Sequence, residues 1–77
     1  MKLDIDYTDL TTIIIELESR ADYYTQEADD IRRALNLEGF AEFAGQDSAQ
    51  SYKETAEWFT DRAASIRRIV KELKKEL

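Results

Sequence analysis

The chain contains no cysteine, histidine or proline, and only two of its 77 residues are glycine. Without cysteine there is no disulfide framework and no thiolate to act as a nucleophile or metal ligand. Without histidine the commonest general base and metal-binding side chain is missing as well. Because proline is absent, nothing in the sequence forces a helix to kink. These absences favour long helices, and they lead us to expect no enzyme activity, no cofactor and no metal site.

Long apolar runs are also missing. No stretch approaches the ~18 apolar residues of a membrane span, and residues 1–6 lack the apolar core of a secretory signal. We therefore expect a cytoplasmic protein with no membrane association. At 77 residues the chain predicts one domain, 1–77, at the small end of what folds alone, so a second copy or a partner is expected to help.

Two uninterrupted heptad ladders are the strongest positive signal. Their apolar residues recur at alternating steps of three and four, the period of a helix that lays one stripe along another helix. The ladders are Leu10, Ile14, Leu17, Ala21, Tyr24, Ala28, Ile31, Leu35 and then Ala49, Tyr52, Ala56, Phe59, Ala63, Ile66, Val70, Leu73, Leu77. They predict an all-α antiparallel hairpin with helices over about 7–38 and 47–76 and a tip over 39–46 that contains a short helical turn.

Capping signals place the ends of these helices. Asp6 is predicted to be the N-cap of the first helix. Gly39 and Gly45 suit the left-handed backbone that closes helical segments. Asp47 or Ser48 is predicted to cap the second long helix.

The two sides of the predicted hairpin differ in polarity. We label Leu17 and Tyr24 as heptad d positions and Ala21 as a. On the second helix Phe59 and Ile66 are then d and Ala63 is a. The e positions are polar, with Glu18 expected opposite Arg67. The g positions carry Ile13 and Ile69, and the adjoining c positions add Tyr23 and Trp58, so this side is apolar. This is more apolar surface than two helices need, so we expect a second copy in a homodimeric four-helix bundle, or a protein partner, to cover it.

Two arginines share the apolar side, Arg20 and Arg62. They could grip a carboxylate or a phosphate on a partner. The favoured interpretation is local pairing, because Glu16 lies one turn before Arg20 and Trp58 lies one turn before Arg62.

Charge is unevenly distributed along a chain whose net charge is −6. Acids dominate residues 1–30 and bases dominate residues 62–77, and the hairpin should set these segments side by side. The middle and the tip stay acidic, which suits a basic protein partner and repels phosphate. The candidate acidic partner surface comprises Glu38, Glu42, Asp47 and Glu54. The simplest alternative is a solvated face that keeps the protein in solution.

Phe40 and Phe43 at the tip allow two interpretations. They could plug the end of the core, which we favour because an exposed pair is an aggregation liability, or they could anchor a partner.

The pattern resembles Rop-type hairpins, short antiparallel helix pairs that dimerise into four-helix bundles with alternating small and large layers. The resemblance covers both ladders but carries over no functional residue, and the acidic middle departs from the basic face of an RNA-binding member. Our leading hypothesis is a small acidic inhibitor or regulator of a larger protein with a basic surface, such as a nucleic-acid-handling or host-defence protein, of the type that mobile elements encode. One alternative is a structural adaptor or assembly subunit that docks by its apolar side. The other is a Rop-like nucleic-acid regulator, which would use Arg67, Arg68, Lys71 and Lys74.

Overall fold

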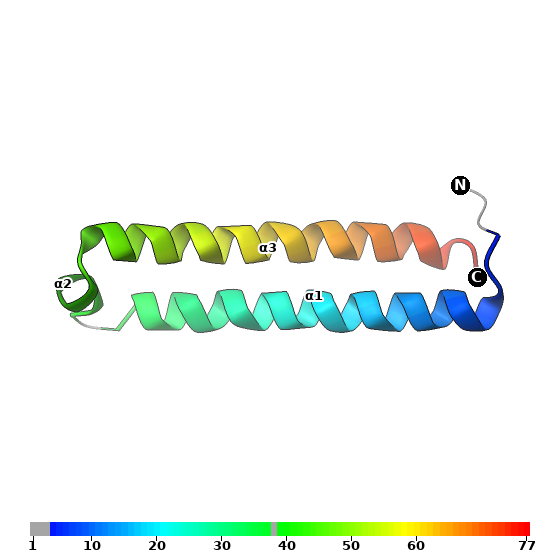
Figure 1. Ribbon diagram of the computed structural model, residues 1–77, viewed down its shortest axis with the longest axis horizontal. Helices are drawn as coiled ribbons and strands as arrows, with labels where there is room; N and C mark the ends of the chain where they lie inside the picture. The colour runs from blue at the N-terminus through cyan, green and yellow to red at the C-terminus, as the bar shows by residue number, and fades with distance from the viewer. Residues whose placement is uncertain (1–3, 38) are drawn as a thin grey trace.

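The computed structural model describes residues 4–37 and 39–77, which form the helices α1 (Tyr7–Leu35), α2 (Phe40–Ala44) and α3 (Gln46–Lys74). α1 and α3 lie side by side and antiparallel, and the short α2 forms the tip (Figure 1). The start of α1 and the end of α3 lie together at the opposite end of a rod measuring 53 × 17 × 12 Å. The predicted all-α antiparallel hairpin is confirmed.

α1 begins at the predicted N-cap. Asp6 has extended backbone, and its carboxylate accepts a hydrogen bond of 2.8 Å from the backbone N–H of Asp9. This bond satisfies one of the N–H groups that the first helical turn leaves without a partner. The carboxylate of Asp9 lies in the same turn, near the positive end of the helix dipole.

α1 ends at Leu35, earlier than the expected end near position 38. The backbone N–H of Asn36 donates to the carbonyls of Arg32 and Arg33, and that of Leu37 donates to the carbonyl of Ala34 at 3.2 Å. Bonds to the third residue back tighten the last turn and lead the chain out of the helix. The heptad pattern marks the last core residue, Leu35, but carries no information about this closing turn. Gly39 then takes the left-handed backbone predicted for it, with φ of 80°.

α3 begins at Gln46, and its N-cap is Gly45 without a side-chain hydrogen bond. The prediction that Asp47 or Ser48 caps this helix is therefore wrong. Gly45 has φ 89° and ψ 156°, a combination that glycine adopts at little cost and other residues almost never adopt. Its sharp turn starts the helix before Asp47, whose carboxylate instead lies in the first turn. At its other end α3 stops at Lys74, before the expected 76.

The core consists of ladder residues. Every side chain that is buried in the described part of the chain belongs to one of the two ladders: Leu10, Ile14, Ala21, Ala28, Ala56, Ala63, Ile66, Val70 and Leu73. The rings of Tyr24 and Phe59 lie 5.4 Å apart, so these two ladder residues share a layer. Tyr52 departs from the pattern, because its side chain is 49% exposed and its ring packs against Phe40 at the tip, at 5.6 Å.

Candidate protein interaction surfaces

The hairpin does not cover its two ladder rows equally. Most a residues are almost completely buried, with exposed fractions of 1–5% for Ile14, Ala21, Ala28, Ala56, Ala63 and Val70. Several d residues in the middle of the hairpin are only half-buried, namely Leu17, Tyr24, Ile31 and Phe59. The contact between α1 and α3 is thus centred on the a row. These four d residues border a side that neither helix covers, whereas the d residues Leu10, Ile66 and Leu73 are buried. We call the side formed by the d, g and c positions the open side.

The four residues that the sequence assigns to this side are exposed. The exposed fractions are 38% for Ile13, 55% for Tyr23, 50% for Trp58 and 51% for Ile69. Each of these side chains stands next to half-buried or buried d residues, so the exposed apolar surface is continuous with the core. Apolar surface of this kind is typical of a contact between proteins.

An aromatic cluster occupies the middle of the open side. The ring of Tyr24 lies 5.8 Å from those of Tyr23 and Trp58, and the rings of Trp58 and Phe59 are 5.1 Å apart. The rings meet edge-on or tilted, the arrangements that aromatic pairs favour. Large rigid rings that are half-exposed offer much contact area at little cost in conformational entropy.

Two arginines flank this cluster. The guanidinium of Arg62 lies 5.3 Å from the centre of the Trp58 ring, which confirms the predicted contact. The guanidinium of Arg20 lies 5.8 Å from the centre of the ring of Tyr24, which is one turn further along α1. We had expected Glu16, one turn earlier, to be its local partner. Both positive charges therefore lie against aromatic faces on the open side.

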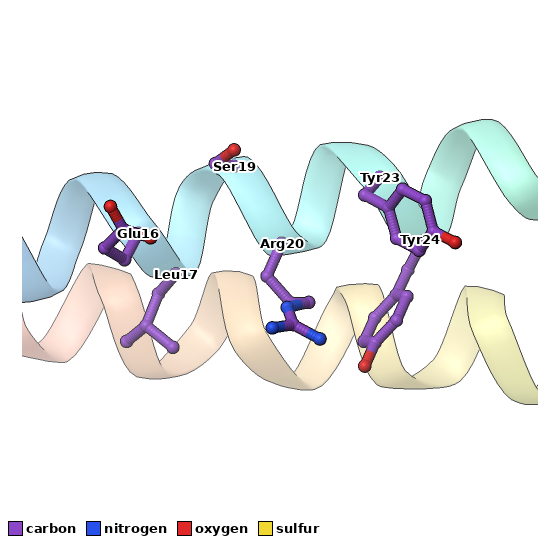
Figure 2. Close-up of a pocket in the computed structure, with 6 residues that line it drawn as sticks. All are labelled: Glu16, Leu17, Ser19, Arg20, Tyr23 and Tyr24. Atoms are coloured by element: carbon purple, nitrogen blue, oxygen red, sulfur yellow. The ribbon is translucent and has the colours of Figure 1, made fainter.

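Grooves run along both helices of the open side. Figure 2 shows one of them, a hollow of about 770 Å³ along α1, where the side chains of Arg20 and Tyr24 extend toward α3. It is lined by Glu16, Leu17, Ser19, Arg20, Tyr23 and Tyr24. Smaller hollows on α3 lie beside Trp58 and Arg62, about 130 Å³, and beside Ile69 and Leu73, about 290 Å³. The open side thus has both ridges and hollows, as a surface that receives helix side chains requires.

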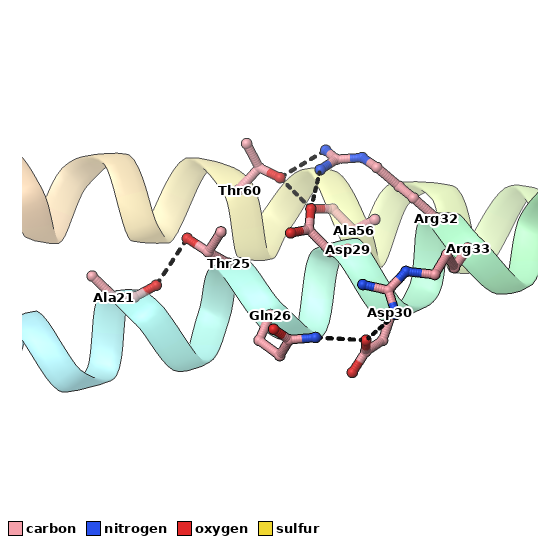
Figure 3. Close-up of polar contacts among 9 residues, drawn as sticks. All are labelled: Ala21, Thr25, Gln26, Asp29, Asp30, Arg32, Arg33, Ala56 and Thr60. Atoms are coloured by element: carbon pink, nitrogen blue, oxygen red, sulfur yellow. Dashed lines mark hydrogen bonds and ion pairs between the residues drawn. The ribbon is translucent and has the colours of Figure 1, made fainter.

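The opposite side, formed by e and b positions, is polar and joins the two helices. Arg32 donates a hydrogen bond of 2.7 Å to the Thr60 hydroxyl, which itself donates to the carbonyl of Ala56 (Figure 3). Nearer the chain ends, Lys74 pairs with Glu18 at 3.5 Å and Arg67 pairs with Asp22 at 3.2 Å. The hairpin's own polar contacts therefore occupy the side away from the aromatic cluster.

Glu18 forms its ion pair with Lys74, one heptad beyond the Arg67 that the heptad labels place opposite it. Helix side chains lean toward the N-terminus of their own helix, so in an antiparallel pair two long side chains meet when each starts C-terminal to the meeting point. Lys74 reaches Glu18, and Arg32 reaches Thr60, in this way. The acidic start of α1 does lie beside the basic end of α3, as the charge distribution predicted.

The two phenylalanines of the tip lie in different environments. Phe40 is half-buried against Tyr52, whereas the side chain of Phe43 is 93% exposed. The favoured interpretation of the pair as a core plug is therefore wrong for Phe43, because the short α2 turns only one of its rings toward α3. Of the candidate acidic surface, Glu42, Asp47 and Glu54 are exposed around this tip, and Glu38 lies outside the described residues.

Among the described residues, the carboxyl group of Glu72 has a clearly shifted pKa. Lys75 Nζ donates hydrogen bonds to both carboxylate oxygens of Glu72, at 3.0 and 3.2 Å. This bond, and then the charge of Lys75, lower the pKa of Glu72 below its ordinary value, with a smaller contribution from the charge of Lys71. Glu72 is fully exposed, so the shift reflects a surface ion pair and not a buried catalytic acid.

Sequence reasoning missed some exposed apolar residues. Ile15, at a b position, is 59% exposed, and Leu37, just after α1, is 66% exposed. The heptad labels alone could have identified Ile15, because b positions lie outside the a and d rows that form the core. Leu37 could not be placed without knowing that α1 ends at Leu35.

Comparisons with protein families, with curated proteins and with solved structures found no match to this chain. Within residues 4–37 and 39–77, no helix combines the length and apolarity needed to cross a membrane. The same residues contain no group of three or more acidic side chains placed to hold a metal ion.

Proposed function

We propose that this protein is a small, acidic, non-catalytic inhibitor or regulator that acts by binding a larger protein with a basic surface. The observation that carries the proposal is Phe43, a large apolar side chain that is 93% exposed at the tip. It stands among the exposed carboxylates of Glu42 and Asp47, with Glu54 further along α3. An aromatic anchor surrounded by charge of one sign is the arrangement of a binding hot spot with a charged rim.

The proposed partner has an apolar pocket for the Phe43 ring and lysine or arginine residues around it. The net charge of −6 would speed its approach, and the attraction would weaken with added salt. A nucleic-acid-handling protein of a host cell, which carries basic surface for its own substrate, fits this chemistry. The proposed site of this binding is the cytoplasm, which is consistent with the absence of cysteine from the chain.

We also propose that the protein is a homodimer, in which the open sides of two hairpins form a four-helix bundle. The half-buried d row and the exposed Ile13, Tyr23, Trp58 and Ile69 support this, because burying each large side chain contributes ~1.5–3 kcal/mol. The open side is also of a suitable size, because its face of 53 × 17 Å is comparable with the ~800 Å² per partner that standard interfaces bury.

A structural adaptor remains the second candidate, and the same open side is the observation that favours it. An adaptor would use that side to dock on a larger complex and would be monomeric alone. The nucleic-acid regulator is less well supported, because Lys74 and Arg67 of the basic end are paired with Glu18 and Asp22.

Partner capture with matched variants tests the leading function. Wild type, Phe43→Ala and the triple reversal of Glu42, Asp47 and Glu54 to lysine are immobilised, and the proteins that each retains are identified by mass spectrometry. We expect a basic protein that wild type retains and that both variants lose, with weaker retention in high salt. Reversal of Lys53 to glutamate is the control, because it adds no positive charge to the tip. A captured protein that is indifferent to Phe43 and to the tip charges would contradict the proposal, and tight binding of the isolated protein to RNA or DNA would favour the nucleic-acid regulator.

A further inference from the structure

The open side has a charge and shape pattern that matches itself when it is reversed. Along α1 the pattern runs Ile13, Glu16, Arg20, Tyr23 at g and c positions: apolar, acidic, basic, aromatic. Ile13 and Tyr23 are equally far from position 18, and so are Glu16 and Arg20. If a second α1 runs antiparallel with its position 18 at the same height, each isoleucine meets a tyrosine and each glutamate meets an arginine.

The same symmetry recurs on α3. Trp58 and Ile69 are equally far from the midpoint between Ala63 and Ala64, and Arg62 and Ser65 flank the same midpoint. A second, antiparallel α3 centred there would place each tryptophan on an isoleucine, and each arginine beside a serine hydroxyl. Trp58 and Ile69 both line hollows of the open side that such a partner could fill.

The two centres lie within about two residues of each other along the hairpin. The contact between Tyr24 and Phe59 fixes the register of α1 against α3. In that register Leu17 shares a layer with Ile66, and Ala21 shares one with Ala63. Position 18 of α1 lies next to the first of these layers and the midpoint after Ala63 lies next to the second, about two residues or ~3 Å apart along the helices. A two-fold axis placed midway, lying in the interface and perpendicular to the helices, passes within about one residue of both centres, an offset that long side chains can span in an isologous contact.

We infer that the occupant of the open side is a second copy of this chain in the antiparallel orientation, with α1 against α1 and α3 against α3. In this seam Arg20 of each copy pairs with Glu16 of the other. The inference rests on the proposed homodimer and adds its orientation, its register and its charge contacts.

The opposite orientation is disfavoured by the same residues. In a parallel dimer, with both tips at one end, α1 faces α3 of the second copy at equal height. Arg20 then meets Arg62, so one layer would gather the arginines of both copies on both helices. Like charges placed opposite one another across an interface weaken it and reject that pairing.

The register also decides what remains uncovered. Position 18 is nearer to the start of α1 than to its end, so the two α1 helices overlap over about residues 7–29 and leave the last turns before each tip unpaired. The tips extend beyond the second copy, at opposite ends of the bundle. Phe43 and the surrounding carboxylates therefore stay exposed in the dimer, which presents two identical partner surfaces.

Charge exchange across the seam tests this arrangement. In a Glu16→Arg dimer each seam pair becomes two bases, and in an Arg20→Glu dimer each becomes two acids, so both variants should dimerise about tenfold or more weakly than wild type. Mixed together, one variant supplies only bases and the other only acids, and every seam pair is attractive again. We expect native mass spectrometry of the mixture to show mainly the heterodimer. Asp29→Arg and Arg33→Glu, an acid and a base with the same spacing away from the open side, are the matched controls and should mix without preference.

Each outcome distinguishes the register from dimerisation itself. A parallel dimer would respond to Arg20→Glu in the opposite sense, because the new glutamate would face Arg62, so tighter self-association of this variant overturns the inference. A wild-type dimer whose variants show no heterodimer preference also overturns it, while leaving the proposed dimer standing. A wild type that stays at 9.0 kDa in sedimentation overturns both.

Single cysteines give a second, geometric readout, since the chain has none of its own. Under mild oxidation, Ile13→Cys mixed with Tyr23→Cys should form a disulfide-linked heterodimer. Tyr23→Cys mixed with Trp58→Cys should not, because these positions meet only in the parallel dimer. The reverse result would overturn the antiparallel seam even if the charge variants failed to fold.

Discussion

The two phenylalanines of the tip should differ strongly in their effect on stability. Replacing a buried phenylalanine by alanine costs ~3–5 kcal/mol, because the side chain's burial is lost and a cavity remains. Phe40 is half-buried and its ring packs edge-on against Tyr52, so Phe40→Ala should cost about half of that, ~2 kcal/mol. Phe43 is 93% exposed, so Phe43→Ala should change the free energy of unfolding by less than ~0.5 kcal/mol.

Thermal melts of both variants, followed by circular dichroism at one protein concentration, measure this difference. In a domain of this size ~1 kcal/mol corresponds to roughly 4–8 °C, so Phe40→Ala should melt about 10 °C below wild type and Phe43→Ala close to it. A double-mutant cycle with Tyr52→Ala should give a coupling of ~0.5–1.5 kcal/mol to Phe40 and none to Phe43. Equal destabilisation by the two alanine variants would show that the Phe43 ring is covered in solution and would refute the reasoning.

Three further predictions follow from the turn, the end of α3 and the open side. Gly45→Ala should lower the free energy of unfolding by ~1–3 kcal/mol, because alanine is strained at φ 89° although nothing lies within 4 Å of its added methyl group. In the same denaturant titration Gln46→Ala should be nearly neutral. In an NMR titration the pKa of Glu72 should rise in Lys75→Ala. A lowered folded-state pKa stabilises the fold above the unfolded pKa, and this stabilisation is lost as the pH falls through the folded pKa, so only wild type should lose this small contribution in acid. The melting temperature of wild type should increase with protein concentration, and Ile69→Glu should abolish that dependence by giving a monomer or an unfolded chain; a concentration-independent wild type would contradict a second copy on the open side.

The sequence predicted the core well because the core depends on one period. A step of 3.5 residues determines which side chains face a neighbouring helix, so the burial of Ile14, Ala21 and Val70 could be predicted without a structure. The N-cap at Asp6 could be predicted for a similar reason, since a cap needs only a short acceptor at the right offset.

The features that sequence reasoning misplaced depend on direction rather than period. The pairing of Lys74 with Glu18 reflects the lean of side chains along their helices, which a list of opposing positions omits. The start of α3 depends on the backbone of Gly45, which removes the need for a side-chain cap. The exposure of Phe43 depends on how far α2 is rotated against α3, and no residue pattern in a five-residue helix specifies that rotation.

The unequal burial of the two ladder rows connects the stability of the hairpin with its proposed function. Ala21, Ala28, Ala56 and Ala63 let α1 and α3 approach closely, but small side chains contribute little buried area, and no large side chain in the described residues is completely buried. The larger residues of the d row, such as Leu17 and Tyr24, would reach full burial only when the open side is covered. An antiparallel second copy would cover the half-buried d residues in and around the aromatic cluster and would leave the tips free. Self-association and partner binding then use different surfaces, so a partner at Phe43 need not compete with the contact that stabilises the fold.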